Sequence, residues 1–268
     1  MTERITPDLR DQLIALAEQA GDAIMGVYRS QDFDVMTKSD DSPLTRADTV
    51  SQRVLGVLDG DLGLPLLSEE GRIPSYQERK AWSAHWLVDP LDGTKEFIHR
   101  NGEFTVNIAL IQDHRPVFGV VHVPVTGVTY VGGKDHPSVR IDGKGEQPIH
   151  VSSPHDGPIH VVASHSHMDP ATVAYIDALG SHATVAAGSS LKFCLVAEGS
   201  ADVYPRFGPT MEWDTAAGQA VVEGAGGLVL SDGRPLQYNR EDLLNPPFLV
   251  AAPWLLERHP ERMVGSAA

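Results

Sequence analysis

Two aspartates three residues apart follow a short apolar run in the segment VDPLDGTKEF. Asp89 and Asp92 flank a proline and Leu91, so a turn at the end of a strand would present two carboxylates and the Leu91 carbonyl to one side. Mg²⁺ takes oxygen ligands of this kind together with water and substrate phosphate. Gly93 permits close backbone approach, and Thr94 opens a predicted helix whose first N–H groups would hold a phosphate oxygen. The segment therefore predicts metal-assisted phosphate chemistry.

Three further acidic residues lie where predicted elements begin or end. Glu69 and Glu70 follow an apolar run in LLSEEG, and Asp214 lies at a predicted helix start in EWDTAAG. Each feature also has a plainer interpretation: turn chemistry for the aspartate pair, a solvated loop for the glutamates and an N-cap for Asp214. All of them border apolar runs, which favours a shared metal site.

Two basic residues are set among apolar neighbours in the second half of the chain, Lys192 in SSLKFC and Arg206 in YPRFG. Both side chains bind phosphate, and arginine can do so in bidentate fashion. They predict a second anion site, with the alternative that they are long side chains whose charged ends reach solvent.

Other reactive residue types are predicted to carry no chemistry. Cys194 lies in an apolar helical stretch and is interpreted as core. Five histidines are close in sequence but spread over polar loops and a strand, and are not predicted to form a metal-binding set: His150, His155, His160, His165 and His167.

Elements that would position these residues can be predicted from periodicity. Helical spacing starts at Thr6-Pro7 and again over about 47–58, where Gly60 lies near the expected end. Strands are predicted at 64–67, 86–88, 105–111, 117–123 and 128–131. From about Ile159 strand-like and helix-like segments alternate, which favours α/β layering, while the tail after Pro253 has little pattern.

Composition excludes several classes of function. The chain has 268 residues, 41% of them hydrophobic, and 21 Lys and Arg against 36 Asp and Glu give a net charge of -15. This charge repels nucleic acid, so a duplex-binding role is excluded. The sequence shows no transmembrane run or signal peptide, and its single cysteine cannot form an internal disulfide. We therefore expect a cytoplasmic protein with no transmembrane segment.

Three separated motifs resemble one known superfamily. LSEEG, WLVDPLDGTKEF and WDTAAGQAVVEGAGG, in this order, are similar to the lithium-sensitive, Mg²⁺-dependent inositol monophosphatase superfamily. SPLTRAD, GSSLKFCLVAEGSADVYPRFGPTMEWDTAAG and LLNP look like its CysQ-type 3'(2'),5'-bisphosphate nucleotidase branch. The resemblance implies the α/β (α+β) class and a layered αβαβα sandwich. We expect one phosphatase domain over 1–268, with an α+β half at about 1–150 that holds most metal ligands and an α/β half at about 151–268.

The resemblance also implies roles for individual residues. The implied metal ligands are Glu69, Asp89, the carbonyl of Leu91, Asp92 and Asp214. Glu70 would act through water, and Thr94, hydrogen-bonded to Asp48 of TRAD, would orient and deprotonate the attacking water. The implied substrate contacts are the N–H groups of Gly93 and Thr94, then Asp214, with Ser189, Lys192 and Arg206 for the sugar and 5'-phosphate and His167 near the base. One departure is ASHSHMD, where His165 stands in place of an expected arginine.

The implied activity is hydrolysis of the 3'-phosphate of adenosine 3',5'-bisphosphate to AMP in sulfur assimilation, with two or three Mg²⁺ ions and inhibition by Li⁺. 3'-Phosphoadenylyl sulfate is a further candidate substrate. Two alternatives stay open, a phosphatase for inositol phosphates or fructose 1,6-bisphosphate and a catalytically silent phosphometabolite sensor. We expect a monomer or homodimer in the cytoplasm, with peripheral association at the cytoplasmic face of the inner membrane as a further expectation.

Overall fold

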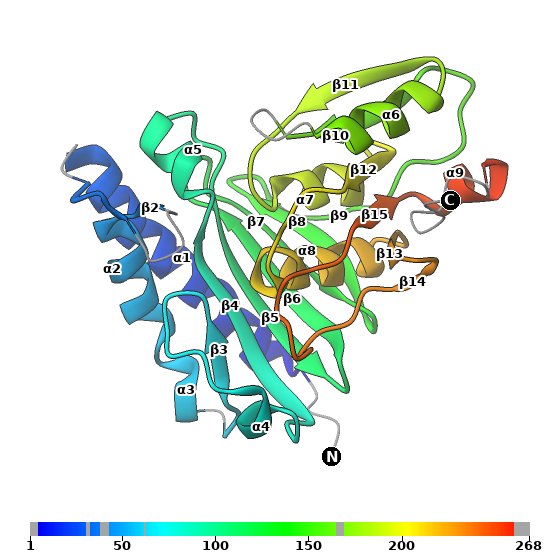
Figure 1. Cartoon of the computed structure of the whole chain (residues 1–268). Helices are drawn as coiled ribbons and strands as arrows, with labels where there is room; N and C mark the ends of the chain where they lie inside the picture. Colours follow the sequence, from blue (N-terminus) through cyan, green and yellow to red (C-terminus); the bar gives the residue numbers. More distant parts are fainter. Residues whose placement is uncertain (1–4, 31–32, 38–42, 62, 165–168, 260–268) are drawn as a thin grey trace.

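The fold has five alternating layers of helix and sheet (Figure 1). A computed structural model of the chain describes residues 5–30, 33–37, 43–61, 63–164 and 169–259. Helices α1 and α2 cover one face of a seven-stranded sheet, and α7 and α8 lie between this sheet and a six-stranded one. Helix α6 and the short helix α9 pack on the outer face of the second sheet. The predicted α/β (α+β) class and the layered αβαβα sandwich are confirmed.

The outer helical layer begins where the sequence predicts. Helix α1 (Pro7–Ser30) starts after Thr6, whose Oγ1 accepts from the N–H of Leu9 at 3.2 Å. The second predicted helix is shorter than expected, because α2 (Arg46–Leu55) ends at Gly56 and a separate turn of helix, α3 (Leu58–Asp61), follows. Glycine is a weak helix former, which fits an end at this point. Between α1 and α2, β1 (Met36–Thr37) and β2 (Pro43–Leu44) form a short antiparallel pair.

The first sheet has the order β3-β4-β5-β6-β7-β8-β9, with β3 parallel to β4 and the other neighbours antiparallel. Its strands are β3 (Leu66–Ser68), β4 (Ala84–Asp92), β5 (Thr105–Gln112), β6 (Arg115–Val123), β7 (Val128–Gly133), β8 (His136–Asp142) and β9 (Gly145–Pro148). Helix α4 (Tyr76–Arg79) precedes β4, and α5 (Thr94–His99) follows it.

Two expectations for this sheet are wrong. The segment DPLD was predicted to be a turn after a strand at 86–88, but β4 runs on to Asp92 and pairs with β5, with an irregularity between Asp89 and Asp92. No strand was predicted between 131 and Ile159, yet β8 and β9 lie there. β9 is exposed along its whole length, so it lacks the alternation of apolar residues by which strands are predicted.

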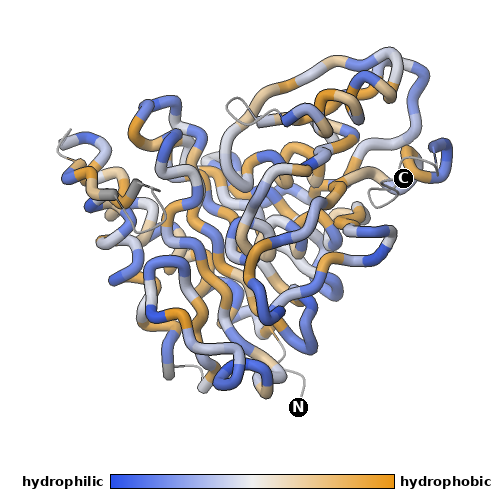
Figure 2. Tube along the Cα trace, in the orientation of Figure 1, coloured by the Kyte–Doolittle hydropathy of each residue, from blue (hydrophilic) through white to orange (hydrophobic). Residues whose placement is uncertain are grey.

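Strand alternation divides the interior into three hydrophobic cores. On β5, Val106, Ile108 and Leu110 face the α1 and α2 layer, whereas Ala109 and Ile111 face the central helices. Successive side chains of a strand point to opposite faces, so one strand contributes to two cores. Figure 2 shows the resulting hydrophobic stretches along the inner strands and hydrophilic residues at many of the loops.

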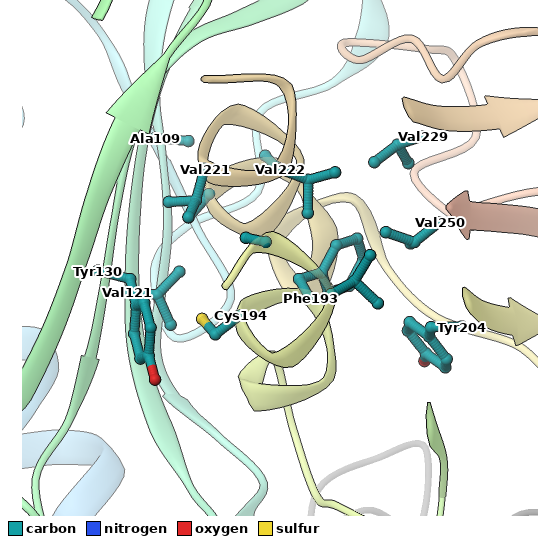
Figure 3. Close-up of a cluster of buried hydrophobic side chains, with 14 of the residues drawn as sticks. Ala109, Val121, Tyr130, Phe193, Cys194, Tyr204, Val221, Val222, Val229 and Val250 are labelled. Atoms are coloured by element: carbon teal, nitrogen blue, oxygen red, sulfur yellow. The ribbon is translucent and has the colours of Figure 1, made fainter. Parts of the chain in front are cut away.

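The central core joins the two sheets. Helix α7 (Leu191–Ala197) carries Phe193 and Cys194 into it, and α8 (Glu212–Gly224) carries Val221 and Val222 (Figure 3). The predicted core position of Cys194 is confirmed, since this side chain is fully buried. The backbone of α8 approaches β6 so closely that a Cβ on Gly119 would lie 2.4 Å from the main-chain oxygen of Ala217.

The second sheet has the order β11-β10-β12-β15-β13-β14, in which β10 is parallel to β11 and β12. Its strands are β10 (Ile159–Ala163), β11 (His182–Ala186), β12 (Val203–Arg206), β13 (Leu228–Ser231), β14 (Arg234–Pro235) and β15 (Phe248–Ala251). The outer helices are α6 (Pro170–Ala178) and α9 (Pro253–Arg258). The alternation predicted from Ile159 onward is confirmed, while α9 lies in the tail for which no element was predicted.

No helix within the described ranges is both long and apolar enough to cross a membrane. The two sheets take up residues 66–148 and 159–251, and the central core draws on both. That the whole chain is one phosphatase domain with two halves stays a prediction.

Candidate active site

Strand β4 carries the central carboxylates. Asp89 pairs with Asn107 of β5 and Asp92 pairs with Thr105, and the irregularity between the two aspartates lets both reach the same region. Asp89 is only 1% exposed, and its Oδ1 accepts from the N–H of Leu91 at 3.0 Å. Its Oδ2 is buried and accepts no hydrogen bond from any residue that the structure describes.

The third carboxylate comes from the other side of the central layer. Asp214 is the third residue of α8, and its Oδ2 accepts from the N–H of Met211 at 2.8 Å, as a helix cap does. Carboxylate oxygens of Asp89, Asp92 and Asp214 all lie within 4.8 Å of one another. The N-cap of α8 is Met211 and not Asp214, but Asp214 accepts from the N-cap N–H with one oxygen, which leaves its other oxygen for the cluster.

Glu69 and Glu70 follow β3, which is the parallel neighbour of β4. The N–H of Glu69 donates to the carbonyl of Val88 at 3.3 Å, so the chain stays beside β4 as it reaches Asp89. Both glutamates are half-buried. Glu69 is close enough for its charge to act on Asp89 and Asp214. The role of Glu70 through water stays a prediction.

Unbalanced negative charge dominates the electrostatics of this region. Burial, followed by the charges of Glu69, Asp92 and Asp214, raises the pKa of Asp89 well above its usual range. Burial and the charges of Asp92 and Glu69 likewise raise the pKa of Asp214, although the N–H of Met211 acts in the opposite direction. A bound cation relieves the electrostatic repulsion among clustered carboxylates of this kind.

Asp48 and Thr94 meet beside the carboxylates. Asp48 is buried in the first turn of α2, where its Oδ2 accepts from both the N–H and the hydroxyl of Thr45 at 2.6 Å. Thr94 Oγ1 donates to the other oxygen, Oδ1, at 3.1 Å, and also lies 3.4 Å from the carbonyl of Leu91. The contacts with Thr45, the N-cap of α2, therefore fix the carboxylate of Asp48, which accepts the hydrogen bond from Thr94.

Gly93 links β4 to α5 in a conformation that favours glycine. Its φ is +94°, and a Cβ there would lie 3.2 Å from Cβ of Ser189 and 3.4 Å from the carbonyl of Glu103. The backbone at the start of α5 is therefore left uncovered on the side of the pocket.

Five of the predicted substrate residues line one pocket, namely Gly93, Ser189, Lys192, Arg206 and Asp214, whereas Thr94 is not part of its lining. Its volume is about 140 Å³, and it is lined by Asp92, Gly93, Glu96, Ser164, Ser189, Lys192, Phe193, Tyr204, Arg206, Pro209, Thr210, Asp214, Thr215 and Phe248. Lys192 and Arg206 thus share a cavity with Asp92 and Asp214, although they lie on different elements. His167, predicted near the base, lies outside the described residues.

Both basic residues are held in place by the protein. Lys192 is buried and its Nζ donates to the carbonyl of Ser189 at 2.7 Å, while burial lowers the pKa of Lys192 to about 8. Arg206 Nη2 donates to the carbonyl of Pro209 at 3.0 Å. Two polar atoms of this wall, Ser189 Oγ and Arg206 Nε, are buried and have no partner in the described part of the chain. Such atoms are suited to a polar ligand.

Comparison with known proteins places the chain in a family. A model of the inositol monophosphatase family matches residues 7–262. The chain belongs to the inositol monophosphatase family. CysQ of Escherichia coli (strain K12), a 3'(2'),5'-bisphosphate nucleotidase, is 50% identical over 253 residues, which cover 90% of this chain and 98% of the relative.

Solved structures of the inositol monophosphatase family have the same fold. CysQ from Bacteroides thetaiotaomicron superposes with a TM-score of 0.81 at 44% identity, covering 89% of this chain and 95% of that one. An IMPase of Thermotoga maritima superposes with a TM-score of 0.76 at 22% identity, covering 95% of each chain, and this likeness concerns the fold alone.

The residues of the inositol monophosphatase site fit a hard divalent cation. The cluster offers only oxygen donors, includes the buried and unpaired Asp89 Oδ2, and carries charge that no described basic side chain neutralises by a direct ion pair. Asp89, Asp92 and Asp214 are close enough together to hold one ion, while Glu69 and the Leu91 carbonyl stay predicted ligands.

Sequence reasoning missed one hydrogen-bonded group in this family member. Ser190 donates its N–H to Asp92 Oδ2 at 2.6 Å, and its Oγ lies 2.7 Å from the same oxygen and 2.7 Å from the carbonyl of Asp214. Asn107 Nδ2 donates to Ser190 Oγ at 2.8 Å. Ser190 therefore connects a carboxylate of β4 with the start of α8. An available signal was Asn107 itself, a lone amide inside the apolar strand TVNIALI.

Proposed function

We propose that this chain is a Mg²⁺-dependent 3'(2'),5'-bisphosphate nucleotidase that converts adenosine 3',5'-bisphosphate and water to AMP and phosphate in sulfur assimilation. The observation that carries the proposal is a single pocket lined both by the carboxylates of Asp92 and Asp214 and by two basic side chains, the buried Lys192 and the half-buried Arg206. A substrate with two phosphates would use both groups, the carboxylates through bound metal and the basic side chains directly. The activity named for the E. coli relative at 50% identity agrees with it.

Hydrolysis needs a water molecule that is positioned and deprotonated. Thr94 Oγ1 donates a hydrogen bond to Asp48 Oδ1. The lone pairs of Thr94 Oγ1 are therefore directed away from Asp48 and can accept a proton from water. As the water oxygen bonds to phosphorus, its proton passes to Thr94 and the Thr94 proton passes to Asp48. The bond from phosphorus to the 3'-oxygen breaks, and that oxygen takes up a proton from solvent.

Mg²⁺, when bound, would neutralise the phosphate oxygens, lower the pKa of the bound water and stabilise the leaving oxygen. The N–H groups of Gly93 and Thr94 are proposed to hold the reacting phosphate. We expect two or three ions, with Glu70 acting through water, and inhibition by Li⁺.

The non-reacting end of the substrate would lie against the basic wall. We assign the 5'-phosphate to Lys192 and Arg206 and the sugar to Ser189, because each presents a buried polar atom or charge to the pocket. 3'-Phosphoadenylyl sulfate has a phosphate at the same position and is proposed as a second substrate. The contact of His167 with the base, the monomeric or homodimeric state and the cytoplasmic or membrane-peripheral location stay predictions from sequence.

A phosphate-release panel tests the reaction. The purified chain is assayed with Mg²⁺ and with excess chelator on adenosine 3',5'-bisphosphate, 3'-AMP, inositol 1-phosphate and fructose 1,6-bisphosphate. We expect the highest kcat/KM for adenosine 3',5'-bisphosphate. In excess chelator we expect no phosphate release from any substrate. A preference for inositol 1-phosphate or fructose 1,6-bisphosphate would assign another phosphatase activity of the family, and no release from any of them would point to a sensor.

The Arg206→Ala variant tests the basic wall. Loss of a charge-assisted contact to phosphate should remove about 2 to 4 kcal/mol of transition-state stabilisation, or about 30- to 1000-fold in kcat/KM, for adenosine 3',5'-bisphosphate. Hydrolysis of 3'-AMP, which lacks the 5'-phosphate, should change little. Arg234→Ala, at an exposed arginine of β14, is the control. Equal losses on the two substrates would mean that Arg206 supports the fold or the metal site.

A further inference from the structure

A second cluster of metal-binding side chains lies in the second sheet, away from the pocket. His155, His160 and Asp202 each offer one ligand atom within 4.8 Å of the others. Asp202 is 1% exposed at its side chain, whereas the side chains of His155 and His160 are 29% and 46% exposed. A buried carboxylate is thus paired with two imidazoles that solvent can reach.

The distances suit a small transition-metal ion. Asp202 Oδ2 lies 3.0 Å from His155 Nε2 and 3.6 Å from His160 Nδ1. Ligands about 2.0 to 2.1 Å from a tetrahedral Zn²⁺ are about 3.3 Å apart, which falls between these two values. Small rotations of the imidazoles would therefore bring both nitrogen-to-oxygen distances to this value without moving the backbone.

Surrounding groups orient the proposed ligands. Ser152 Oγ donates to Asp202 Oδ1 at 2.5 Å, and Trp254 Nε1 donates to Ser152 Oγ at 3.2 Å. The imidazole of His155 packs edge-on against the Trp254 ring, with centroids 5.2 Å apart. Outer hydrogen bonds of this kind fix carboxylate and imidazole ligands in protein metal sites.

The cluster is distinct from the phosphatase pocket. His160 lies at the start of β10 and Asp202 just before β12, and the N–H of Asp202 donates to the carbonyl of His160 at 2.8 Å. Ser164 and Arg206, at the opposite ends of these parallel strands, line the pocket. Four residues of strand separate Asp202 from Arg206, which is about 13 Å.

We propose that His155, His160 and Asp202 form a structural site for Zn²⁺ or a similar transition metal. Two neutral imidazoles and one carboxylate favour such ions over Mg²⁺, which prefers oxygen ligands and would go to the acidic cluster. The ion would join the loop before β10, the strands β10 and β12 and, through Ser152 and Trp254, helix α9. The half-exposed side of His160 leaves a fourth position for water.

The proposed site differs from an expectation from the sequence. The histidines between His150 and His167 were predicted to form no metal-binding set, and among themselves His155 and His160 supply only two ligands. The third ligand, Asp202, lies 42 residues after His160 and is brought to it by the pairing of β10 with β12. Sequence proximity alone could not indicate it.

Zinc binding to the full chain tests the proposal. Chelator-treated protein is equilibrated with Zn²⁺ in saturating Mg²⁺, which occupies the acidic cluster, and bound zinc is measured after dialysis. We expect one equivalent of zinc and an increase in Tm. His155→Ala and His160→Ala should each lose the bound zinc and the increase in Tm, while Ser152→Ala should weaken zinc affinity by about 10- to 100-fold.

Two controls separate this site from other zinc sites. His182→Ala removes a histidine of the neighbouring strand β11, and Asp89→Asn alters the acidic cluster. Both should retain one equivalent of zinc. Co²⁺ offers a second measurement, because an open-shell ion close to Trp254 should quench its fluorescence, and Trp254→Phe should remove that signal.

The result that would overturn the proposal is absence of zinc binding in saturating Mg²⁺, or binding that persists unchanged in both His155→Ala and His160→Ala. In either case the cluster would be a hydrogen-bonded group in which His155 binds Asp202 directly. Asp202→Ala is unsuited to this test, because loss of a buried carboxylate with four contacts to Ser152, His155 and His160 is expected to destabilise the fold.

Discussion

Replacement of Ser190 by alanine should uncouple the two parts of the acidic site. The Ser190 hydroxyl lies between Asp92 Oδ2 and the carbonyl of Asp214, each at 2.7 Å, and accepts from Asn107 at 2.8 Å. A hydroxyl has one proton, so it donates to one of these oxygens at a time. Ser190→Ala removes this atom and keeps the N–H that donates to Asp92.

The size of the effect follows from burial. Ser190 and Asn107 are each 1% exposed, so water cannot replace the lost partner without rearrangement. A hydrogen bond to a charged group contributes about 1.5 to 3 kcal/mol, while Asn107 Nδ2 keeps Asp92 Oδ2 as a second partner at 3.3 Å. We expect the free energy of unfolding of the metal-free protein to fall by about 2 to 3 kcal/mol. The affinity for Mg²⁺ should fall by about 10- to 100-fold, because Asp92 loses an outer hydrogen bond.

The assay combines urea unfolding in excess chelator with calorimetric titration of Mg²⁺ without substrate. Ser189→Ala is a matched control from the preceding residue, because Ser189 Oγ has no partner in the described structure. It should leave stability and Mg²⁺ affinity nearly unchanged. The reasoning is refuted if Ser190→Ala binds Mg²⁺ as tightly as the wild type, or if both serine variants lose affinity to the same extent.

Two further predictions concern buried charge. Asp89→Asn should abolish the increase in Tm on adding Mg²⁺ and raise the stability of the metal-free protein, since it removes a carboxylate repelled by Glu69, Asp92 and Asp214; a less stable metal-free variant in chelator would contradict this. Lys192 has a pKa of about 8 in the folded protein and 10.5 in the unfolded chain, so between these values the unfolded chain binds more protons and stability should rise with pH. Urea titrations from pH 7 to 10.5 should give a flatter slope for Lys192→Met than for the wild type, and identical slopes would rule out this contribution.

The sequence predicted elements best where apolar periodicity was strong. The strands of the first sheet up to β7 and the alternation after Ile159 follow from their alternating or continuous apolar runs. The strands β8 and β9 were missed because β9 is exposed and has no apolar pattern. The DPLD segment was mistaken for a turn because proline and aspartate are frequent in turns, whereas here pairing with β5 keeps them in a strand.

Site residues were predictable where a residue type is itself unusual for its place. Asp89 and Asp92 follow an apolar run, and a basic residue in an apolar stretch singled out Lys192. Ser190 could not be found in this way, because serine is common at helix starts and its role depends on where Asp92 and α8 meet. The pairing of Asp202 with His160 likewise depends on strand order.

The distribution of charge in the pocket gives the proposed substrate one orientation. The chain carries a net charge of -15, and the clustered carboxylates of Asp89, Asp92 and Asp214 repel any phosphate until cations are bound. Two unit charges 4 Å apart in a partly solvated site interact by about 4 kcal/mol, which is enough to exclude an unaccompanied phosphate. Lys192 and Arg206 can attract a phosphate without a bound cation. Both side chains are held in position by main-chain carbonyls of the protein. We therefore propose that Lys192 and Arg206 hold the 5'-phosphate, while bound metal makes the carboxylates attractive to the phosphate that is to be cleaved. The two phosphates would thus be neutralised differently, one by the protein and the other by bound ions, and we propose on this ground that the 3'-phosphate binds beside Asp48 and Thr94.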